Sequence, residues 1–364
     1  MRVLIAAAGV VSLLAGGGAA GPHVQTLYKS PSGPIAAFAQ DGSLLSWFEP
    51  GKQSCNHVQL LSLDGVRVTL PNQRSGNQNV TCRWNVTGPI RLALGGTRVL
   101  WSLYEQAPVE YDYVVGASVS DRRERRFQEI AHGHRGAGLW LGGVAGDGST
   151  LVYSTIAVGY VNRLSCLSGG SCKLRVIGGS VLRVVGRRYV PIKGIGPTID
   201  IAASGTRIAY IPAGPAVDRN GSPLPSPDRP IEVRDALTGA FVSRVEPAGV
   251  PERVALSPHV LAVLERTSRG PLVEWFDAAR GGQRLGAVRL ARGVGDNLSA
   301  SDQLIAFHVG RSLRAIDVAT HTVRVLAEAA STPIGLSLEG SRLAWAENVG
   351  GQGSIHAIFL RGRG

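Results

Sequence analysis

The sequence contains few lysines, a single methionine and, after its first 20 residues, no long hydrophobic run. The lack of such runs excludes a polytopic membrane protein, because a spanning helix needs about 20 apolar residues. Charged residues make up only 18% of the 364 residues and hydrophobic residues make up 44%, so the chain can bury a large core. Glycine and proline are plentiful, with 48 Gly and 20 Pro, and their frequency excludes long helical bundles.

Short catalytic motifs are also absent. The sequence has no G-x-S-x-G elbow, no H-E-x-x-H pair and no P-loop. His132 and His134 can chelate a metal, but no third ligand stands nearby, and a solvated loop is favoured. Asp218 to Ser222 is similar to the start of a calcium loop, but its glycine is in the fourth position and an Asn-Gly turn is favoured. We therefore expect no metal, no cofactor and no catalytic residue of a recognisable motif.

The N-terminus indicates the compartment. A basic residue, Arg2, precedes the apolar stretch Val3–Ala15, and small residues follow up to Ala20. This order is typical of a secretory signal peptide, which predicts a signal segment over residues 1–20 and a single mature domain over residues 21–364. The alternative is a retained membrane anchor. We expect the protein to be secreted or held in the cell envelope, outside the cytoplasm.

Cysteine usage agrees with export. The chain has four cysteines, an even number, which favours two disulfides in an oxidising compartment. Proximity favours pairing Cys55 with Cys82 and Cys166 with Cys172 among the three possible pairings. Zinc is the competing interpretation, but the spacing has no C-x-x-C and no histidine pair in register.

Internal repeats predict the fold. A unit made of an apolar strand, a turn and a second strand with an apolar or aromatic anchor occurs seven times. Its copies are Ile35–Trp47, Ile90–Trp101, Leu141–Tyr153, Ile199–Tyr210, Arg253–Val263, Leu298–Phe307 and Ile334–Trp345. Five copies have a glycine five residues before the anchor, namely Gly42, Gly96, Gly148, Gly205 and Gly340. A β-turn that requires glycine, followed by a fixed number of strand residues, explains this spacing.

Further strands follow several copies. Third strands are expected within Val58–Gly65, Ile231–Gly239, Leu272–Gly282 and Leu313–His321, and fourth strands within Val66–Leu70, Phe241–Val245 and Val323–Ala327. Four antiparallel strands in each repeat predict an all-β, seven-bladed β-propeller. The last repeat lacks a fourth strand, whereas His23–Lys29 forms a surplus strand at the other end. We expect this N-terminal strand to complete the last blade and so cover both sheet edges.

Two copies carry a family resemblance. The segments Asp41–Trp47 and Asp147–Tyr153 share a DG-x-x-L-x-W/Y pattern, which resembles the WD-like repeats of TolB-type propellers. The resemblance covers nearly all of the mature chain, although the copies from Arg253 and Leu298 lack the glycine. It implies a binding scaffold of the cell envelope and identifies a fold rather than an activity.

Several connections are long and are expected on one face of the propeller. They are Pro50–His57, Asn72–Gly88, Ala157–Lys173 and Pro212–Pro230. Long loops held by a rigid scaffold are where propellers usually bind. Acidic residues recur just past the second strand, at Glu49, Glu105, Glu265 and Glu347. They either form a ring around the loop face or mark strand ends that reach solvent, and the second interpretation is favoured.

The net charge of +12 comes almost entirely from arginine. Asp121–Phe127 contains four arginines in five residues, Arg122, Arg123, Arg125 and Arg126, and Arg187-Arg188 adds a pair. Outside the cytoplasm such a cluster can attract an anionic envelope component, although a solvated turn between strands is the favoured interpretation. The signal segment and the lack of stacking motifs argue against nucleic acid as a partner.

These observations predict an exported binding or scaffolding propeller, expected to be monomeric, whose partner is a protein or an anionic envelope component. No membrane span is expected after signal cleavage. The alternative is an extracytoplasmic carbohydrate-active enzyme, a hydrolase or lyase, with its site at the mouth of the channel. Such enzymes take acids and bases from several blades, so short motifs do not reveal them.

Overall fold

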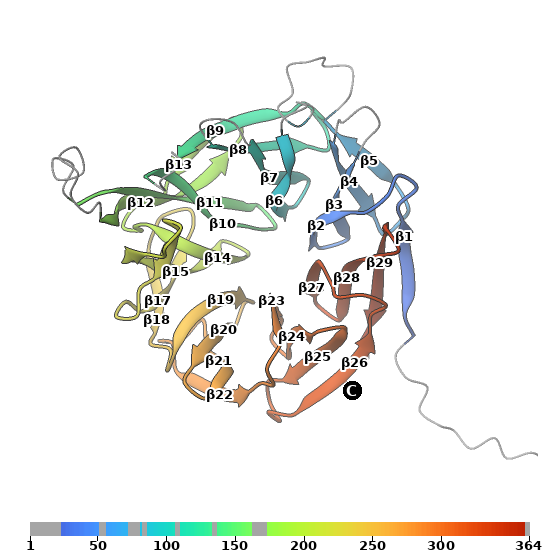
Figure 1. The fold of residues 1–364 in the computed structure, drawn as a ribbon. Helices are drawn as coiled ribbons and strands as arrows, with labels where there is room; N and C mark the ends of the chain where they lie inside the picture. Colours follow the sequence, from blue (N-terminus) through green and yellow to red (C-terminus); the bar gives the residue numbers. More distant parts are fainter. Residues whose placement is uncertain are drawn as a thin grey trace, which may run out of the picture.

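The computed structural model describes residues 23–50, 56–71, 81, 86–105, 110–132, 137–161 and 173–360. The described chain is all-β and forms seven four-stranded antiparallel blades around a central axis (Figure 1). No helix in these ranges is long and apolar enough to cross a membrane. The prediction of a seven-bladed propeller is confirmed.

The blades follow one another along the chain, and each begins with the strand nearest the axis (Figure 1). Blade 1 contains β2 (Ala36–Asp41), β3 (Leu44–Pro50), β4 (Asn56–Ser62) and β5 (Arg67–Leu70). Blade 2 contains β6 (Val86–Gly95), β7 (Arg98–Glu105), β8 (Glu110–Ser118) and β9 (Arg125–His132). Blade 3 contains β10 (Gly138–Asp147), β11 (Thr150–Tyr160), β12 (Leu174–Val185) and β13 (Arg188–Pro191). Pairing of Gly138 with His132 joins blades 2 and 3 into one eight-stranded sheet.

The other four blades complete the ring. Blade 4 contains β14 (Thr198–Ser204), β15 (Arg207–Val217), β17 (Ile231–Asp235) and β18 (Phe241–Val245), with β16 (Pro223–Pro225) paired to β15. Blade 5 contains β19 (Val250–Leu256), β20 (Val260–Thr267), β21 (Gly270–Asp277) and β22 (Arg284–Arg289). Blade 6 contains β23 (Val294–Ala300), β24 (Leu304–Val309), β25 (Ser312–Asp317) and β26 (Val323–Glu328). Blade 7 contains β27 (Gly335–Glu339), β28 (Arg342–Val349), β29 (Gln352–Phe359) and the N-terminal strand β1 (Gln25–Lys29).

Closure by the N-terminal strand is confirmed. β1 pairs antiparallel with β29, and the register runs from Gln25 opposite Ala357 to Lys29 opposite Ser354. The two ends of the described chain therefore lie in the same blade, and β1 covers the edge that β29 would otherwise expose.

The repeated glycines have the backbone conformation that the sequence predicts. Gly42, Gly96, Gly148, Gly205 and Gly340 have φ angles between 54° and 58°, in the left-handed region that other residues rarely adopt. Each lies in the turn between the first and second strands of its blade. The repeat spacing therefore follows from a local backbone requirement.

The core lies between neighbouring blades. Phe48 and Leu60 of blade 1 pack in one cluster with Trp101 and Tyr113 of blade 2, and equivalent clusters join the other blades. The anchors Trp47, Trp101 and Trp345 are each 1% exposed or less. Burial of such large side chains between blades stabilises the whole ring, since each blade covers its neighbour.

Candidate functional site at the channel mouth

The first-to-second and third-to-fourth strand turns lie on one face of the ring, here called the turn face. A cavity of about 870 Å³ opens there at the end of the central channel. Its lining includes Gln40, Asp147, Ser204, Ser257 and Glu339, which belong to five different blades. The ends of the inner strands therefore direct polar side chains to one place, as expected for the mouth of a propeller channel.

Three carboxylates from three blades meet at this mouth. Asp41, Asp147 and Glu339 are the last residues of β2, β10 and β27. One carboxylate oxygen from each lies within 4.8 Å of the other two. Each acid precedes a positive-φ glycine, so the same position of the repeat supplies all three groups. The sequence analysis did not single these acids out, although their common place before the glycine was visible.

Backbone amides hold two of these carboxylates. Oδ2 of Asp41 accepts hydrogen bonds from the backbone N–H of Gly96 and, at 2.8 Å, from that of Gly148. Asp147 accepts one from the backbone N–H of Gly205 in the same way. Each acid thus bonds to the turn of a following blade, and the hydrogen bonds link the turns of blades 1 to 4. The repeated Asp-Gly pattern has a structural role in joining the blades.

The crowding of negative charge changes the proton affinity of the cluster. Burial, and then the Asp41 carboxylate, raise the pKa of Asp147 above its ordinary value. Burial, Asp147 and Asp41 together raise the pKa of Glu339 to about 7, while Arg342 opposes the shift. Near neutral pH the cluster therefore retains a proton on Glu339 in a large fraction of molecules.

This arrangement has two possible chemical uses. Three carboxylate oxygens at this spacing suit a hard divalent cation, which would replace the proton, although no metal was expected from the sequence. Glu339, whose pKa is raised to about 7, also has the character of a general acid, and the carboxyl group of Asp41 lies beside it.

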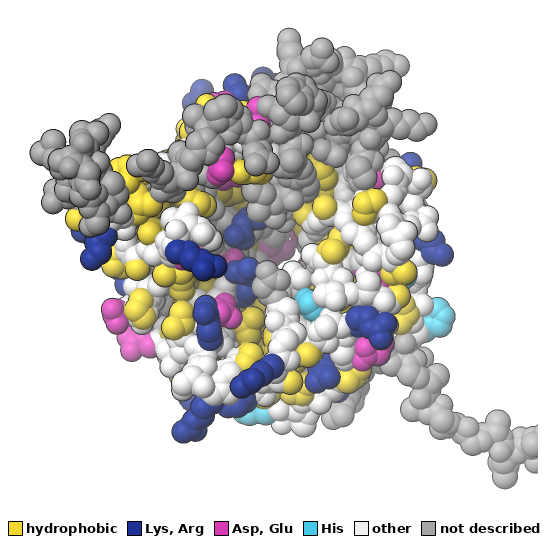
Figure 2. Space-filling view, in the orientation of Figure 1, with side chains coloured by type: hydrophobic (Ala, Val, Ile, Leu, Met, Phe, Trp, Pro, Cys, Tyr) yellow, Lys and Arg dark blue, Asp and Glu magenta, His cyan; other side chains and the backbone are white. Residues whose placement is uncertain are grey.

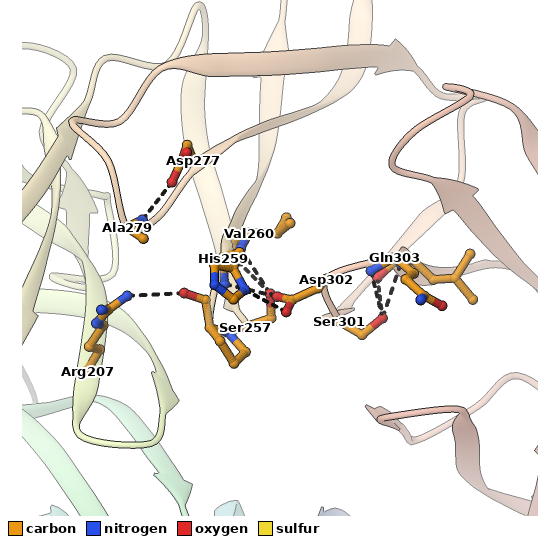
Figure 3. A network of polar contacts seen from close by, with 11 residues as sticks. Arg207, Ser257, His259, Val260, Asp277, Ala279, Ser301, Asp302 and Gln303 are labelled. Carbon is orange, nitrogen blue, oxygen red and sulfur yellow. Dashed lines mark hydrogen bonds and ion pairs between the residues drawn. The ribbon is translucent and has the colours of Figure 1, made fainter. Parts of the chain in front are cut away.

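Arginine and histidine side chains continue the ring of turn contacts. Arg342 of β28 is buried and donates hydrogen bonds to Gln40 Oε1 at 3.1 Å and to the Gly42 carbonyl at 2.6 Å, which links blade 7 to blade 1. Figure 3 shows the link between blades 5 and 6. There Asp302 accepts hydrogen bonds from the Ser257 hydroxyl at 2.7 Å and the His259 backbone at 2.9 Å.

The set of Ser257, His259 and Asp302 is not a catalytic triad. His259 Nδ1 lies 2.7 Å from Asp302 Oδ2, but the Ser257 hydroxyl bonds to the aspartate rather than to the imidazole (Figure 3). A nucleophilic serine requires the histidine as its base. This network connects two turns.

A mixed-charge group links the first strands of blades 2 and 4. Asp200 of β14 is 7% exposed and lies 3.9 Å from the guanidinium of Arg91, on β6. Burial raises the pKa of Asp200, while Arg253 and Arg91 favour its ionised form. Figure 2 shows one face of the molecule, hollowed at its centre, with basic and acidic side chains around the hollow.

The favoured interpretation of the four recurring glutamates is wrong. Glu49, Glu105, Glu265 and Glu347 lie within second strands and are 0 to 8% exposed, so they do not mark strand ends that reach solvent. Three of them bind the segment that leads into their own blade. Glu49 accepts hydrogen bonds from the hydroxyls of Ser30 and Ser32, both at 2.6 Å.

Two more of the four glutamates, Glu265 and Glu347, accept hydrogen bonds from backbone N–H groups. The donor to Glu265 is Gly249, and the donor to Glu347 is Ser331. Sequence reasoning missed this burial because an acidic residue at a strand end is more often exposed. The groups that donate hydrogen bonds to these carboxylates belong to segments between the repeated units. The repeat pattern therefore does not show which residues they are.

The predicted arginine cluster lies away from the channel mouth. Arg122 and Arg123 are exposed in the turn between β8 and β9, and Arg125 and Arg126 begin β9. Arg125 pairs with Asp121, and Arg126 lies 2.9 Å from Glu129. The cluster is thus on the turn face, with two of its charges already in exposed ion pairs.

Several predicted features lie outside the described residues. These are the signal segment 1–20, His134 and all four cysteines, Cys55, Cys82, Cys166 and Cys172. The Asn-Gly turn is described and confirmed: Asp218 Oδ1 accepts from the backbone N–H of Asn220 and Ser222, both at 2.8 Å, and Gly221 has a φ of 84°.

Comparison with known proteins identifies the fold. No family model matches the chain, and no curated protein matches it, so the resemblance to TolB-type propellers is not confirmed at family level. The β-propeller domain of Cps50 (Swd1) from Myceliophteria thermophila is similar with a TM-score of 0.54 and 12% identity, over 92% of this chain and 99% of that one.

Two further structures are similar. The β-propeller domain of the Trilobed protease from Pyrococcus furiosus has a TM-score of 0.54 and 10% identity, over 90% of this chain and 95% of that one. A chain of the mitotic checkpoint complex has a TM-score of 0.51 and 12% identity, over 99% of both chains. At these identities the likeness shows a β-propeller and no more.

Proposed function

We propose that the protein is an exported, non-catalytic binding or scaffolding propeller, whose long-loop face contacts a protein or an anionic component of the cell envelope. The long-loop face is the side opposite the turn face, where second strands connect to third strands and blades connect to one another. Export rests on the signal pattern of residues 1–20. The net charge of +12 favours an acidic partner.

The observation that carries this proposal is a pair of extended hairpins. β11 pairs with β12 as far as Tyr160 opposite Leu174, and β15 pairs with β16 as far as Val217 opposite Pro223. Both hairpins end on the long-loop face. Their side chains pack together in one apolar cluster, which includes Val158 of the first hairpin and Ala213 of the second.

The paired hairpins leave apolar side chains in solvent. Val161, Ile177 and Leu224 are 53%, 64% and 39% exposed. Exposed apolar residues on a rigid projecting element are typical of a protein interface. Among the similar structures, the chain of the mitotic checkpoint complex belongs to a protein assembly, which supports a role among protein partners.

A photo-crosslinking amino acid at position 177 tests the proposal in the native host. We expect one protein adduct of defined mass, identified by mass spectrometry, and loss of that adduct when Val161→Ser and Leu224→Ser are added. The matched control is the same amino acid at Phe241, which is 56% exposed on the outer strand of blade 4. No adduct at position 177, or equal adducts at both positions, would contradict the proposal.

The carboxylates at the channel mouth support a second candidate, an extracytoplasmic carbohydrate-active enzyme. Glu339, with its pKa near 7, would protonate the leaving oxygen, and Asp41 would be the second carboxyl group of the catalytic pair. Release of reducing sugar from purified envelope polysaccharide separates the two functions. The enzyme predicts release that Glu339→Gln abolishes at unchanged melting temperature, whereas the scaffold predicts no release from either protein.

A further inference from the structure

A second cavity, of about 300 Å³, lies between blades 2 and 3 on the turn face. Its lining comes from β7, β8 and β9 of blade 2 and from β11, β12 and the turn after β12 in blade 3. We call it the interblade groove. It is separate from the channel mouth and from the long-loop face, so it concerns neither of the functions above.

The floor of the interblade groove is apolar. Leu151 and Val184 are buried side chains of blade 3, and the partly buried Phe127 of β9 packs with them in the apolar cluster between blades 2 and 3. An apolar cavity of this size accommodates an alkyl chain or an aromatic ring, and the area removed from water supplies the binding energy.

The rim of the groove is basic. Arg98, Arg125 and Arg187 line it, with Asp121 as the single lining carboxylate, so the lining carries a net charge of +2. The structure thus brings together two clusters that are far apart in the sequence, around Arg125 and around Arg187. Asp121 pairs with Arg125 and also attracts the charge of Arg187, so this one carboxylate offsets only part of the positive charge at the rim.

Among the rim arginines, Arg98 has the least favourable electrostatic surroundings. Its guanidinium donates to the carbonyl oxygens of Ser149 at 2.6 Å and Val184 at 3.4 Å, and it pairs with no carboxylate in the described part of the chain. Burial and the neighbouring charge of Arg183 lower the pKa of Arg98. A half-buried cation beside a second cation is unfavourable, and a bound anion relieves that cost.

We propose that the interblade groove binds an anionic amphiphile, meaning an alkyl or aryl group that ends in a phosphate or a carboxylate. The apolar part contacts Phe127 and Leu151 on the floor. The anionic group accepts hydrogen bonds from Arg98 and Arg187 at the rim. A basic rim above an apolar floor selects both parts of such a ligand, since neither a free anion nor a neutral hydrocarbon satisfies the whole lining.

The probe for the test is 11-(dansylamino)undecanoic acid, whose fluorescence rises in an apolar environment. We expect saturable binding to the mature protein and much weaker binding of its methyl ester, which lacks the charge. Arg98→Gln and Arg187→Gln should each weaken binding on the order of tenfold, as loss of a charge-assisted hydrogen bond does. Arg187 is exposed, so its substitution leaves the fold intact even if Arg98→Gln does not.

The matched control is the double variant Arg122→Gln with Arg123→Gln, which removes two charges from the same cluster outside the groove. It should bind the probe like the wild type. An equal loss in the control would overturn the proposal, because binding would then depend on the general basic field. Ser118→Phe, which fills the groove from its edge, should abolish binding, and unchanged binding would also overturn it.

Competition identifies the source of the ligand. Dodecyl phosphate and dodecanoate should both displace the probe, and the stronger of the two identifies the preferred anionic group. Displacement by vesicles of phosphatidylglycerol, and not of phosphatidylcholine, would indicate a membrane lipid, whereas displacement by the monomeric alkyl anions alone would indicate a free ligand. Inorganic phosphate that competes as well as dodecyl phosphate would overturn the role of the apolar floor.

Discussion

The carboxylate of Asp41 in blade 1 accepts a hydrogen bond at 2.8 Å from the backbone N–H of Gly148 in blade 3, across 107 residues of sequence. The same carboxylate accepts from Gly96 of blade 2. One side chain thus connects three blades at the mouth of the channel. Replacement of Asp41 therefore affects both the ring and the candidate site.

Asp41→Ala should lower the free energy of unfolding by about 1–3 kcal/mol, because it leaves two turn amides without their acceptor. It should also lower the pKa of Glu339, which the Asp41 charge helps to raise. Chemical denaturation measures the first effect, and NMR titration of the Glu339 carboxyl measures the second. Asp228→Ala, in an exposed position, is the control and should change neither.

Deletion of residues 23–33 should cause aggregation or a large fall in melting temperature relative to a chain that begins at residue 21. The deletion removes β1, which exposes the edge of β29, and it removes Ser30 and Ser32, which hydrogen-bond to buried Glu49. Differential scanning calorimetry of the two proteins makes the comparison. Equal melting temperatures would mean that β1 does not contribute to closure.

The buried pair Glu265 and Glu274 should make stability depend on pH. Burial and then Glu274 raise the pKa of Glu265 from 4.5 to about 8, so the folded state binds this proton more tightly than the unfolded state. Its stabilising contribution is therefore complete below pH 4.5 and is lost as pH rises through 8.

Glu265→Gln keeps the shape of the side chain and removes its titration. We compare the melting temperatures of this variant and the wild type at each pH. The difference, variant minus wild type, should increase steadily as the pH is raised from 4.5 to 8. Glu246→Gln, at an exposed ion pair with Arg244, should show no such trend. A difference in melting temperature between Glu265→Gln and the wild type that stays constant with pH would contradict the raised pKa of Glu265.

Changing Arg122, Arg123, Arg125 and Arg126 to Ser should leave the melting temperature unchanged. The ion pairs of Arg125 and Arg126 are exposed and contribute little to stability. The variant should lose much of its retention on an anionic polymer at low salt, and the wild type should lose its retention as salt rises, because exposed charges act over about 10 Å at 0.1 M salt. Equal retention of the variant and the wild type at low salt would show that this cluster has no role in binding.

Non-reducing peptide mapping of protein recovered from the secreted fraction of the native host should show the pairs Cys55–Cys82 and Cys166–Cys172 and no free thiol. Closing the longer loop, about 27 residues, should contribute about 3 to 4 kcal/mol in the chain-entropy model, and the shorter loop less. Reduction should therefore lower the melting temperature. Free thiols in the exported protein would contradict both pairings.

The sequence by itself determined the number of blades, their order and the closing strand. These features depend on local requirements that are repeated: a glycine that adopts positive φ, an apolar anchor at a fixed distance after it, and alternation along each strand. It did not assign the third and fourth strands of blades 2 and 3, β8, β9, β12 and β13, or the fourth strand of blade 5, β22, because their bounding turns lack the pattern of the other copies.

Only the tertiary structure decided which distant side chains meet. Asp41, Asp147 and Glu339 come together because ring closure brings the ends of three inner strands to one axis. Arg98 and Arg187 share a groove because blades 2 and 3 pack face to face, and Glu265 is buried because the chain entering blade 5 covers it. Such contacts depend on the packing of whole blades, and a repeat pattern, which describes one blade at a time, contains no information about them.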